Sequence, residues 1–221
     1  MRPLVVVLTG GPCGGKSTAL GRLRDMVSAK FGDFDMDSYS VPEVPTVLHA
    51  GGCRYPGTAA DKSSELLAFE RGILALQIAM EDSFLRIAKS KAPSRKSVLF
   101  LDRGAFDLVS YMGDPSGGLL WNETMLGMMP PCTEESLRAR YDGVLFLQSA
   151  AVGAEAFYTN SNNAARTETV GEARVLDAKT HAVYQSRFKD LIFLENCDGF
   201  ETKMARAETA VSKMIKDHFK I

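Results

Sequence analysis

Short apolar runs alternate with longer segments of helical periodicity along this chain. Most of the runs are rich in Val, Leu, Ile or Phe and lack polar alternation, which is typical of strands that are buried on both faces. The predicted strands are Leu4–Leu8, Ser38–Val41, Val98–Leu101, Val144–Leu147 and Leu191–Leu194. The pattern therefore predicts about five parallel strands in one sheet.

Helical patterns fill the segments between these runs. In the longest of them, apolar residues recur at steps of three and four positions, which predicts one face packed against a core. The predicted helices are Lys16–Lys30, Ser63–Lys91, Thr133–Tyr141, Gly171–Phe188 and Thr202–Phe219. This alternation predicts a three-layer α/β fold with helices on both faces of the sheet. A length of 221 residues fits a single domain that spans residues 1–221.

Composition and charge exclude several classes of protein. Hydrophobic residues make up 45% of the chain and charged residues 24%, which excludes disorder, a collagen-like chain and a coiled coil. The net charge of −1 does not indicate nucleic-acid binding, and no apolar run approaches the ~20 residues of a membrane span. The four cysteines lie far apart without a C-x-x-C pair, so we expect free thiols in a cytoplasmic protein.

The strongest motif follows the first predicted strand and opens the first predicted helix. It fits the pattern G-x-x-x-x-G-K-[ST], in which glycines turn backbone N–H groups toward phosphates. We expect Lys16 to reach the β- and γ-phosphates of ATP or GTP and Ser17 to bind Mg²⁺. The predicted nucleotide-binding residues are Gly10, Gly11, Pro12, Cys13, Gly14, Gly15, Lys16, Ser17 and Thr18.

A second motif, Asp102-Arg103, ends the third predicted strand. Asp102 is a candidate Mg²⁺ ligand, although an aspartate here could also cap a helix. Motor-type ATPases usually place a second acid directly after this aspartate, and Ras-like GTPases carry an N-K-x-D or T-K-x-D element that this chain lacks. An arginine directly after this aspartate resembles the pattern in small-molecule and nucleotide kinases. In those enzymes the planar guanidinium group holds a phosphoryl group. Arg103 is therefore a candidate catalytic residue.

Further candidates lie after the second strand and in a long loop. Glu43 follows the second predicted strand and could orient an acceptor hydroxyl or act as its general base, although a surface glutamate is the simpler interpretation. A lid is predicted at about residues 158–175, because long irregular loops in compact domains are often functional. Its arginines, Arg166 and Arg174, could stabilise the transferring phosphoryl group, or they could be ordinary surface residues.

Other polar groups have simpler interpretations. Glu70, Gln77 and Glu81 interrupt an apolar helix surface and could read a base or ribose, but we expect an ordinary polar edge. Asp177, His181 and Tyr184 share a helix face and are expected to be structural rather than a site. The basic residues of the last helix, Lys203 among them, could touch acidic phospholipid, but we expect a solvated helix face.

Four segments together resemble one family. They are GGPCGGKST at 10–18, VPEVPT at 41–46, LDRGAFD at 101–107 and NNAARTETVGEARVLD at 162–177. They look like the P-loop domain shared by bacterial nicotinamide-riboside-kinase-like proteins and eukaryotic TRPL translocation defect proteins. The resemblance covers most of the chain and implies a kinase-like fold that binds ATP or GTP.

These observations predict a Mg²⁺-dependent P-loop kinase. It would transfer the γ-phosphoryl group of ATP or GTP to a small acceptor that resembles a nucleoside or nucleotide. The alternative is a regulatory nucleotide-binding module with little turnover that engages a protein or an acidic phospholipid. A mechanical ATPase is disfavoured, because Arg103 stands where such an enzyme carries its second acid.

Overall fold

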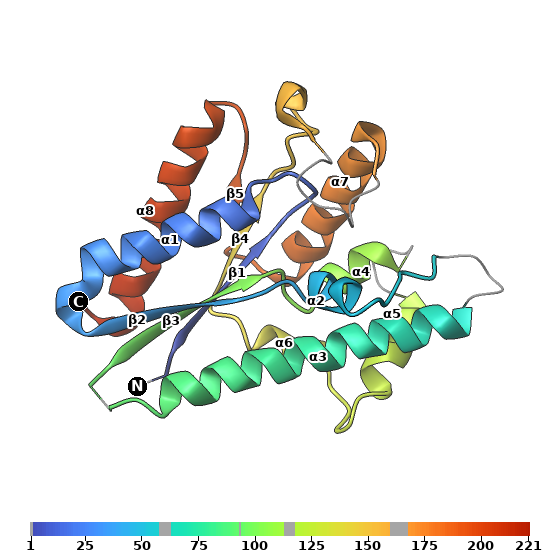
Figure 1. Ribbon diagram of the computed structural model, residues 1–221, viewed down its shortest axis with the longest axis horizontal. Coiled ribbons are helices and arrows are strands. Elements are labelled where there is room, and N and C mark those ends of the chain that lie inside the picture. The colour runs from blue at the N-terminus through green and yellow to red at the C-terminus, as the bar shows by residue number, and fades with distance from the viewer. Residues whose placement is uncertain (1, 58–62, 93, 113–117, 160–167) are drawn as a thin grey trace.

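A five-stranded parallel sheet forms the centre of the molecule, as seen in a computed structural model that describes residues 2–57, 63–92, 94–112, 118–159 and 168–221 (Figure 1). The strand order is β2-β3-β1-β4-β5, and all neighbouring strands are parallel. The strands are β1 (Leu4–Thr9), β2 (Met36–Val41), β3 (Lys96–Asp102), β4 (Gly143–Leu147) and β5 (Ile192–Leu194). The predicted fold class is therefore confirmed, and each observed strand overlaps a predicted one.

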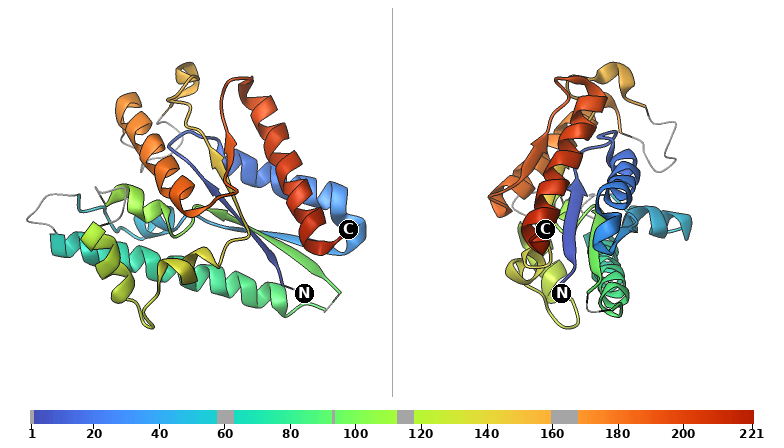
Figure 2. Two further views of the ribbon diagram at one scale, coloured as in Figure 1. Left: turned by 180° about the vertical axis from the view of Figure 1, so that it is seen from behind. Right: turned by 90° about the vertical axis from the view of Figure 1, so that its left-hand side faces the viewer.

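Alternate residues of β1 face two separate cores, because successive side chains of a strand point to opposite faces. Val6 and Leu8 pack against α1 (Lys16–Phe31) and α8 (Gly199–Phe219). Val5 and Val7 belong to the core on the opposite face, which Figures 1 and 2 show covered by the remaining helices. These include α3 (Ser63–Lys89), α4 (Asp107–Tyr111), α5 (Gly118–Leu126), α6 (Glu134–Arg138) and α7 (Val170–Arg187). Burial on both faces explains why the strand is apolar throughout.

Three short helices were not expected from the sequence pattern. They are α2 (Val44–Ala50), α4 and α5. Each has nine residues or fewer, so it is too short to show a helical repeat. The predicted helix at Thr133–Tyr141 is shorter in the structure, because Thr133 is the N-cap of α6 and forms a capping box with Ser136.

The 3₁₀ helices η1 (Gly32–Phe34) and η3 (Glu155–Phe157) complete the described elements. Of the helices within the described ranges, none is long and apolar enough to cross a membrane.

Strand register brings the predicted site residues to one edge of the sheet. Leu8 of β1 lies opposite Asp102 of β3, and Val41 of β2 lies opposite Leu101. Glu43 and Arg103 each follow these paired residues by two positions, so the two parallel strands deliver them side by side. Ligands of open α/β sheets bind at this edge, beyond the carboxyl ends of the strands.

Candidate functional site

The loop between β1 and α1 has the backbone that phosphate binding requires. Gly10, Cys13 and Gly15 have φ angles of 128°, 56° and 85°, which turn the chain through the left-handed region. Gly10 also approaches the Leu147 carbonyl so closely that a Cβ atom would clash with it. Residues 12–18 line a large cavity, and α1 begins beneath them at Lys16. The N-terminus of α1 therefore faces the place where an anion would bind.

Lys16 lies inside this loop as a buried cation. Its Nζ donates to the carbonyl oxygens of Gly10 and Gly11 at 2.9 and 2.8 Å. Burial and the neighbouring Arg103 guanidinium lower the pKa of Lys16 to about 8, although Asp102 and Glu43 act in the opposite direction. An anionic ligand would relieve both effects and favour the charged ammonium.

Ser17 and Asp102 meet across the ends of α1 and β3. The Ser17 hydroxyl donates to Asp102 Oδ2 at 3.5 Å, and both side chains line the cavity. The pKa of Asp102 is raised above its ordinary value, because burial outweighs the opposing effects of the nearby Lys16 and Arg103. A hydroxyl and a carboxylate fit Mg²⁺, which takes few protein ligands and completes its shell with phosphate and water oxygens. Within the described part of the chain, no group of three or more His, Cys, Asp or Glu side chains could hold a metal.

Arg103 connects the P-loop to Glu43. It has a φ angle of 73°, and its side chain pairs through Nε with Glu43 and through a terminal nitrogen with Asp107 at 3.1 Å. The same nitrogen donates to the Gly10 carbonyl at 3.4 Å. Burial alone would raise the pKa of Glu43, but Arg103 and the Thr46 hydroxyl at 2.5 Å outweigh it and lower the pKa to about 2. Glu43 is therefore a carboxylate at any physiological pH.

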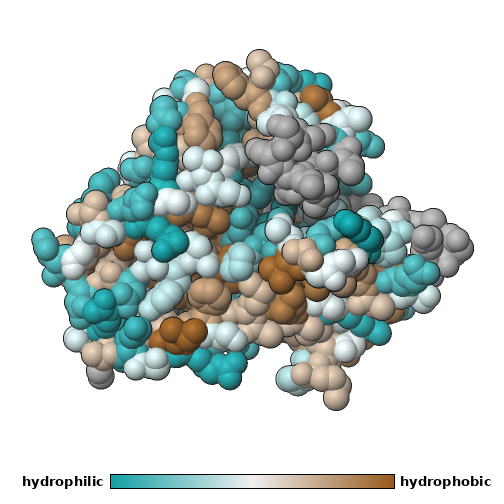
Figure 3. Space-filling view, in the orientation of Figure 1, coloured by the Kyte–Doolittle hydropathy of each residue, from teal (hydrophilic) through white to brown (hydrophobic). Residues whose placement is uncertain are grey.

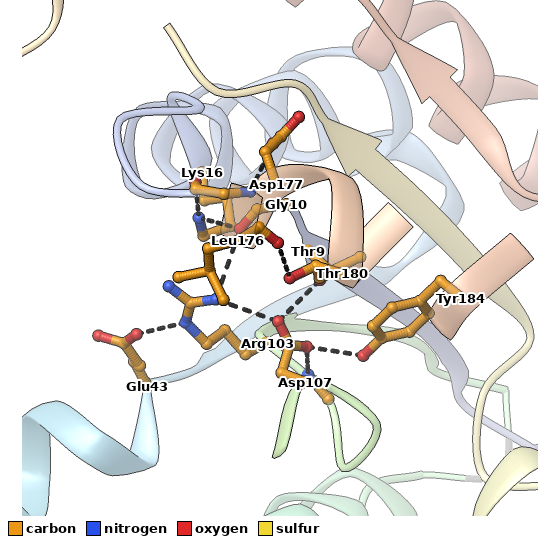
Figure 4. A network of polar contacts seen from close by, with 12 residues as sticks. Thr9, Gly10, Lys16, Glu43, Arg103, Asp107, Leu176, Asp177, Thr180 and Tyr184 are labelled. Carbon is orange, nitrogen blue, oxygen red and sulfur yellow. Dashed lines mark hydrogen bonds and ion pairs between the residues drawn. The ribbon is translucent and has the colours of Figure 1, made fainter. Parts of the chain in front are cut away.

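Asp107 is a buried anchor that sequence reasoning did not single out. Its Oδ1 accepts from the Thr9 hydroxyl at 2.8 Å and from Arg103, as Figure 4 shows. Its Oδ2 accepts from the Gly104 amide at 2.9 Å and the Tyr184 hydroxyl at 2.7 Å. Asp107 thus holds the guanidinium group of Arg103 in position. The available signal was its place at the end of the LDRGAFD segment, four residues after Arg103.

The helix face predicted for α7 is structural, but it also supports the P-loop. Asp177 Oδ1 accepts from the amides of Gly11 and Ser149 at 2.8 and 2.9 Å. His181 instead packs between the rings of Phe146 and Phe193. Tyr184 in turn donates to Asp107, so the three residues of this face contact different neighbours and form no joint site.

The prediction of an ordinary polar edge on α3 is wrong, because Glu70, Gln77 and Glu81 are all buried. Glu81 accepts from Gln77 at 2.8 Å and from the Tyr141 hydroxyl at 2.9 Å, and it pairs with Arg140. Glu70 and Gln77 line the cavity. The helix itself was predicted correctly, but which of its polar side chains face the interior depends on neighbours that only the fold supplies.

Lys203 also departs from the solvated helix face expected for α8. Its side chain is buried, and its Nζ donates to the carbonyls of Gly14 and Gln148 at 3.0 and 2.6 Å and to Asn196 at 2.9 Å. Burial lowers the pKa of Lys203 to about 8. This lysine therefore ties α8 to the P-loop rather than facing a membrane.

The structure describes one of the two arginines of the predicted lid. Arg166 lies outside the described residues. Arg174 donates to the Ala151 carbonyl and pairs with Glu155, both at 2.6 Å, and it is absent from the described lining of the cavity. The catalytic roles of both arginines stay predictions.

One cavity of about 1280 Å³ is lined by Lys16, Ser17, Glu43, Asp102, Arg103 and Asp107. This exceeds the roughly 300–1,000 Å³ of a typical single-ligand pocket. The P-loop forms one part of the lining, and Glu43, Asp102 and Arg103 form another. A third part, here named the α3 side, consists of His49, Arg54, Tyr55, Phe69, Glu70, Ile73 and Tyr111.

Comparisons with known proteins agree with the fold described above. Among solved structures, deoxyadenosine kinase from M. mycoides with bound dATP has a TM-score of 0.54 at 13% identity, covering 95% of this chain and 99% of that one. A NadR protein in complex with NAD and AMP-PNP has a TM-score of 0.53 at 13% identity, covering 96% of this chain and 49% of that one. None of the curated proteins matches this chain in sequence. The family model AAA_28, described as an AAA domain, matches residues 5–201. The chain therefore belongs to this AAA domain family and has the three-layer fold of the P-loop nucleotide kinases.

Proposed function

We propose that this protein is a Mg²⁺-dependent phosphotransferase that moves the γ-phosphoryl group of ATP or GTP to a hydroxyl of a small, nucleoside-like or nucleotide-like acceptor. The observation that carries the proposal is the convergence of Lys16, Arg103 and Glu43 on one cavity with room beyond the P-loop. An NTPase that uses water would not need the additional α3 side. The kinase fold of the solved structures supports the same interpretation.

Each residue of the site has a proposed role in nucleotide binding or in charge stabilisation. Lys16 would release the Gly10 and Gly11 carbonyls and bind the β- and γ-phosphates. Ser17 and Asp102 would hold the Mg²⁺, which neutralises charge on the phosphate oxygens when bound. Arg103, kept in place by Asp107, would face the phosphoryl group in transfer.

Glu43 would orient the acceptor rather than remove its proton early. A bond forms between the acceptor oxygen and the γ-phosphorus, while the bond from that phosphorus to the β,γ-bridging oxygen breaks. A carboxylate with a pKa of about 2 is a weak base, so Glu43 accepts a hydrogen bond from the acceptor hydroxyl. The proton passes to an oxygen of the transferred group late in the step and then to solvent. Positioning of this kind suits phosphoryl transfer, which needs little covalent help.

Glu43→Gln tests this assignment directly. The variant keeps the shape of the side chain but loses its charge, so it loses both the ion pair with Arg103 and the strong acceptor for the hydroxyl. We expect kcat for acceptor-dependent diphosphate release to fall about 10²-fold or more. The Kd for Mg-ATP or Mg-GTP should stay within about twofold of the unmodified protein, as expected for an interaction used in the chemical step.

The assay would measure nucleoside-diphosphate release from Mg-ATP and Mg-GTP with a panel of nucleosides and nucleotides. Release that no acceptor stimulates, together with unchanged behaviour of Glu43→Gln, would contradict the phosphotransferase. Nucleotide-dependent binding to acidic vesicles or to a protein would then support a regulatory module. Figure 3 shows hydrophobic residues scattered in small groups among hydrophilic ones on the face it displays, so that face offers little support for a lipid-binding role.

A further inference from the structure

The α3 side of the cavity holds a buried carboxyl group with an unsatisfied oxygen. Glu70 is only 1% exposed, and its Oε2 has no hydrogen-bond partner among the described residues. Burial raises the pKa of Glu70 to about 8. Nδ1 of His49, in the same lining, is also buried and has no hydrogen-bond partner within the described ranges.

Other buried acids near the cavity all have partners. Glu43 and Asp107 share Arg103, and Glu81 pairs with Arg140. A buried polar group without a partner lowers stability, so an unsatisfied carboxyl that lines a cavity calls for an explanation. Groups of this kind cluster at functional sites, where a ligand supplies the missing interaction.

The surroundings of Glu70 indicate the shape of such a ligand. Tyr55 and Phe69 form an edge-to-face pair with ring centroids 5.8 Å apart, and Ile73 and Tyr111 add further apolar surface. Aromatic walls favour a flat ring. A donor on that ring would favour the ionised form of Glu70 and lower its raised pKa, and the resulting carboxylate accepts hydrogen bonds only.

We propose that Glu70 is a specificity-determining residue that accepts a hydrogen bond from an amino group on a planar heterocyclic ring of the acceptor. The inference rests on the proposed phosphotransferase function, because it places the acceptor on the α3 side. Glu43 would then hold the reacting hydroxyl of the same molecule, and Glu70 would select the ring attached to it. His49 offers a second polar contact for that ring.

Matched ligands that differ only in the amino group test the proposal. Adenosine is compared with purine riboside, and cytidine with its analogue that lacks the 4-amino group. For each pair, Kd is measured by calorimetry with nucleoside diphosphate present, and kcat/KM with Mg-ATP. We expect the protein to prefer the amino-bearing member of at least one pair by about 10- to 100-fold, as expected for one hydrogen bond to a buried charged group.

Glu70→Leu should remove this preference, because leucine cannot accept a hydrogen bond. Glu70→Gln keeps a carbonyl oxygen and should retain part of it. Glu65→Leu makes the same change at an exposed position of α3 and should leave the preference intact. We also expect Glu70→Leu to melt about 3 °C or more above the unmodified protein, because an unsatisfied carboxyl has been removed from the interior. A lower melting temperature would indicate a structural role and count against the proposal.

The outcomes separate this proposal from the function on which it rests. Acceptor-dependent transfer without any preference for the amino group would overturn the role of Glu70 and leave the phosphotransferase standing. A preference in Kd that disappears in Glu70→Leu, without transfer, would support Glu70 and contradict the phosphotransferase. If neither adenosine nor cytidine binds, the role of Glu70 is overturned.

Discussion

Replacing Lys16 with alanine is expected to abolish almost all acceptor-dependent turnover. Lys16 is the buried ammonium of the P-loop, and it donates hydrogen bonds to the carbonyls of Gly10 and Gly11. Without it, the charge that develops on the transferring phosphoryl group loses a stabilising partner. We expect kcat to fall about 10³-fold and nucleotide binding to weaken about 10- to 100-fold.

The measurement is nucleoside-diphosphate release in the presence of an acceptor, with Kd for Mg-ATP from calorimetry. Lys30→Ala is the matched control, because Lys30 lies at the far end of the same helix and is exposed. A Lys16→Ala protein that binds and turns over nucleotide as the unmodified protein does would contradict the proposed site. Lys16→Arg should not restore the rate, since a planar guanidinium cannot occupy the position of a compact ammonium.

Replacing Asp107 with asparagine is expected to cause the largest loss of stability. Its carboxylate accepts hydrogen bonds from four donors, which are Thr9, Arg103, Gly104 and Tyr184. Asparagine would place an NH₂ donor against donors and leave the Arg103 guanidinium less compensated. Removing one partner of a buried ion pair costs about 3–5 kcal/mol, and we expect a loss near the lower end because Glu43 still pairs with Arg103.

Urea unfolding would measure this loss, and Asp217→Asn is the control at an exposed position of α8. We also expect kcat to fall in Asp107→Asn while Tyr184→Phe, which removes one donor only, has a smaller effect on both quantities. An unchanged urea midpoint for Asp107→Asn would show that this network does not stabilise the fold. Unchanged kcat with lowered stability would limit Asp107 to a structural role.

The sequence identified the groups whose positions follow from local chain geometry. The P-loop was predictable because its glycines, Lys16 and Ser17 belong to one strand–turn–helix unit. Asp102 and Arg103 were found because they end a buried strand. Glu43 was found in the same way, and the register of β2 with β3 then explains why it meets Arg103. The short helices α2, α4 and α5 were missed because fewer than ten residues show no helical repeat.

By itself, the sequence determined the fold class and the nucleotide-binding loop, because both rest on apolar periodicity and on residue spacing within short segments. Only the tertiary structure decided which polar residues face the interior. Thr9 and Asp107 are 98 residues apart, and Gly11 and Asp177 are 166 apart, yet each pair is hydrogen-bonded. A polar residue on a helix looks the same in sequence whether it meets solvent or a buried neighbour. The environments of Lys203 and Glu70 therefore became visible only when distant elements were packed together.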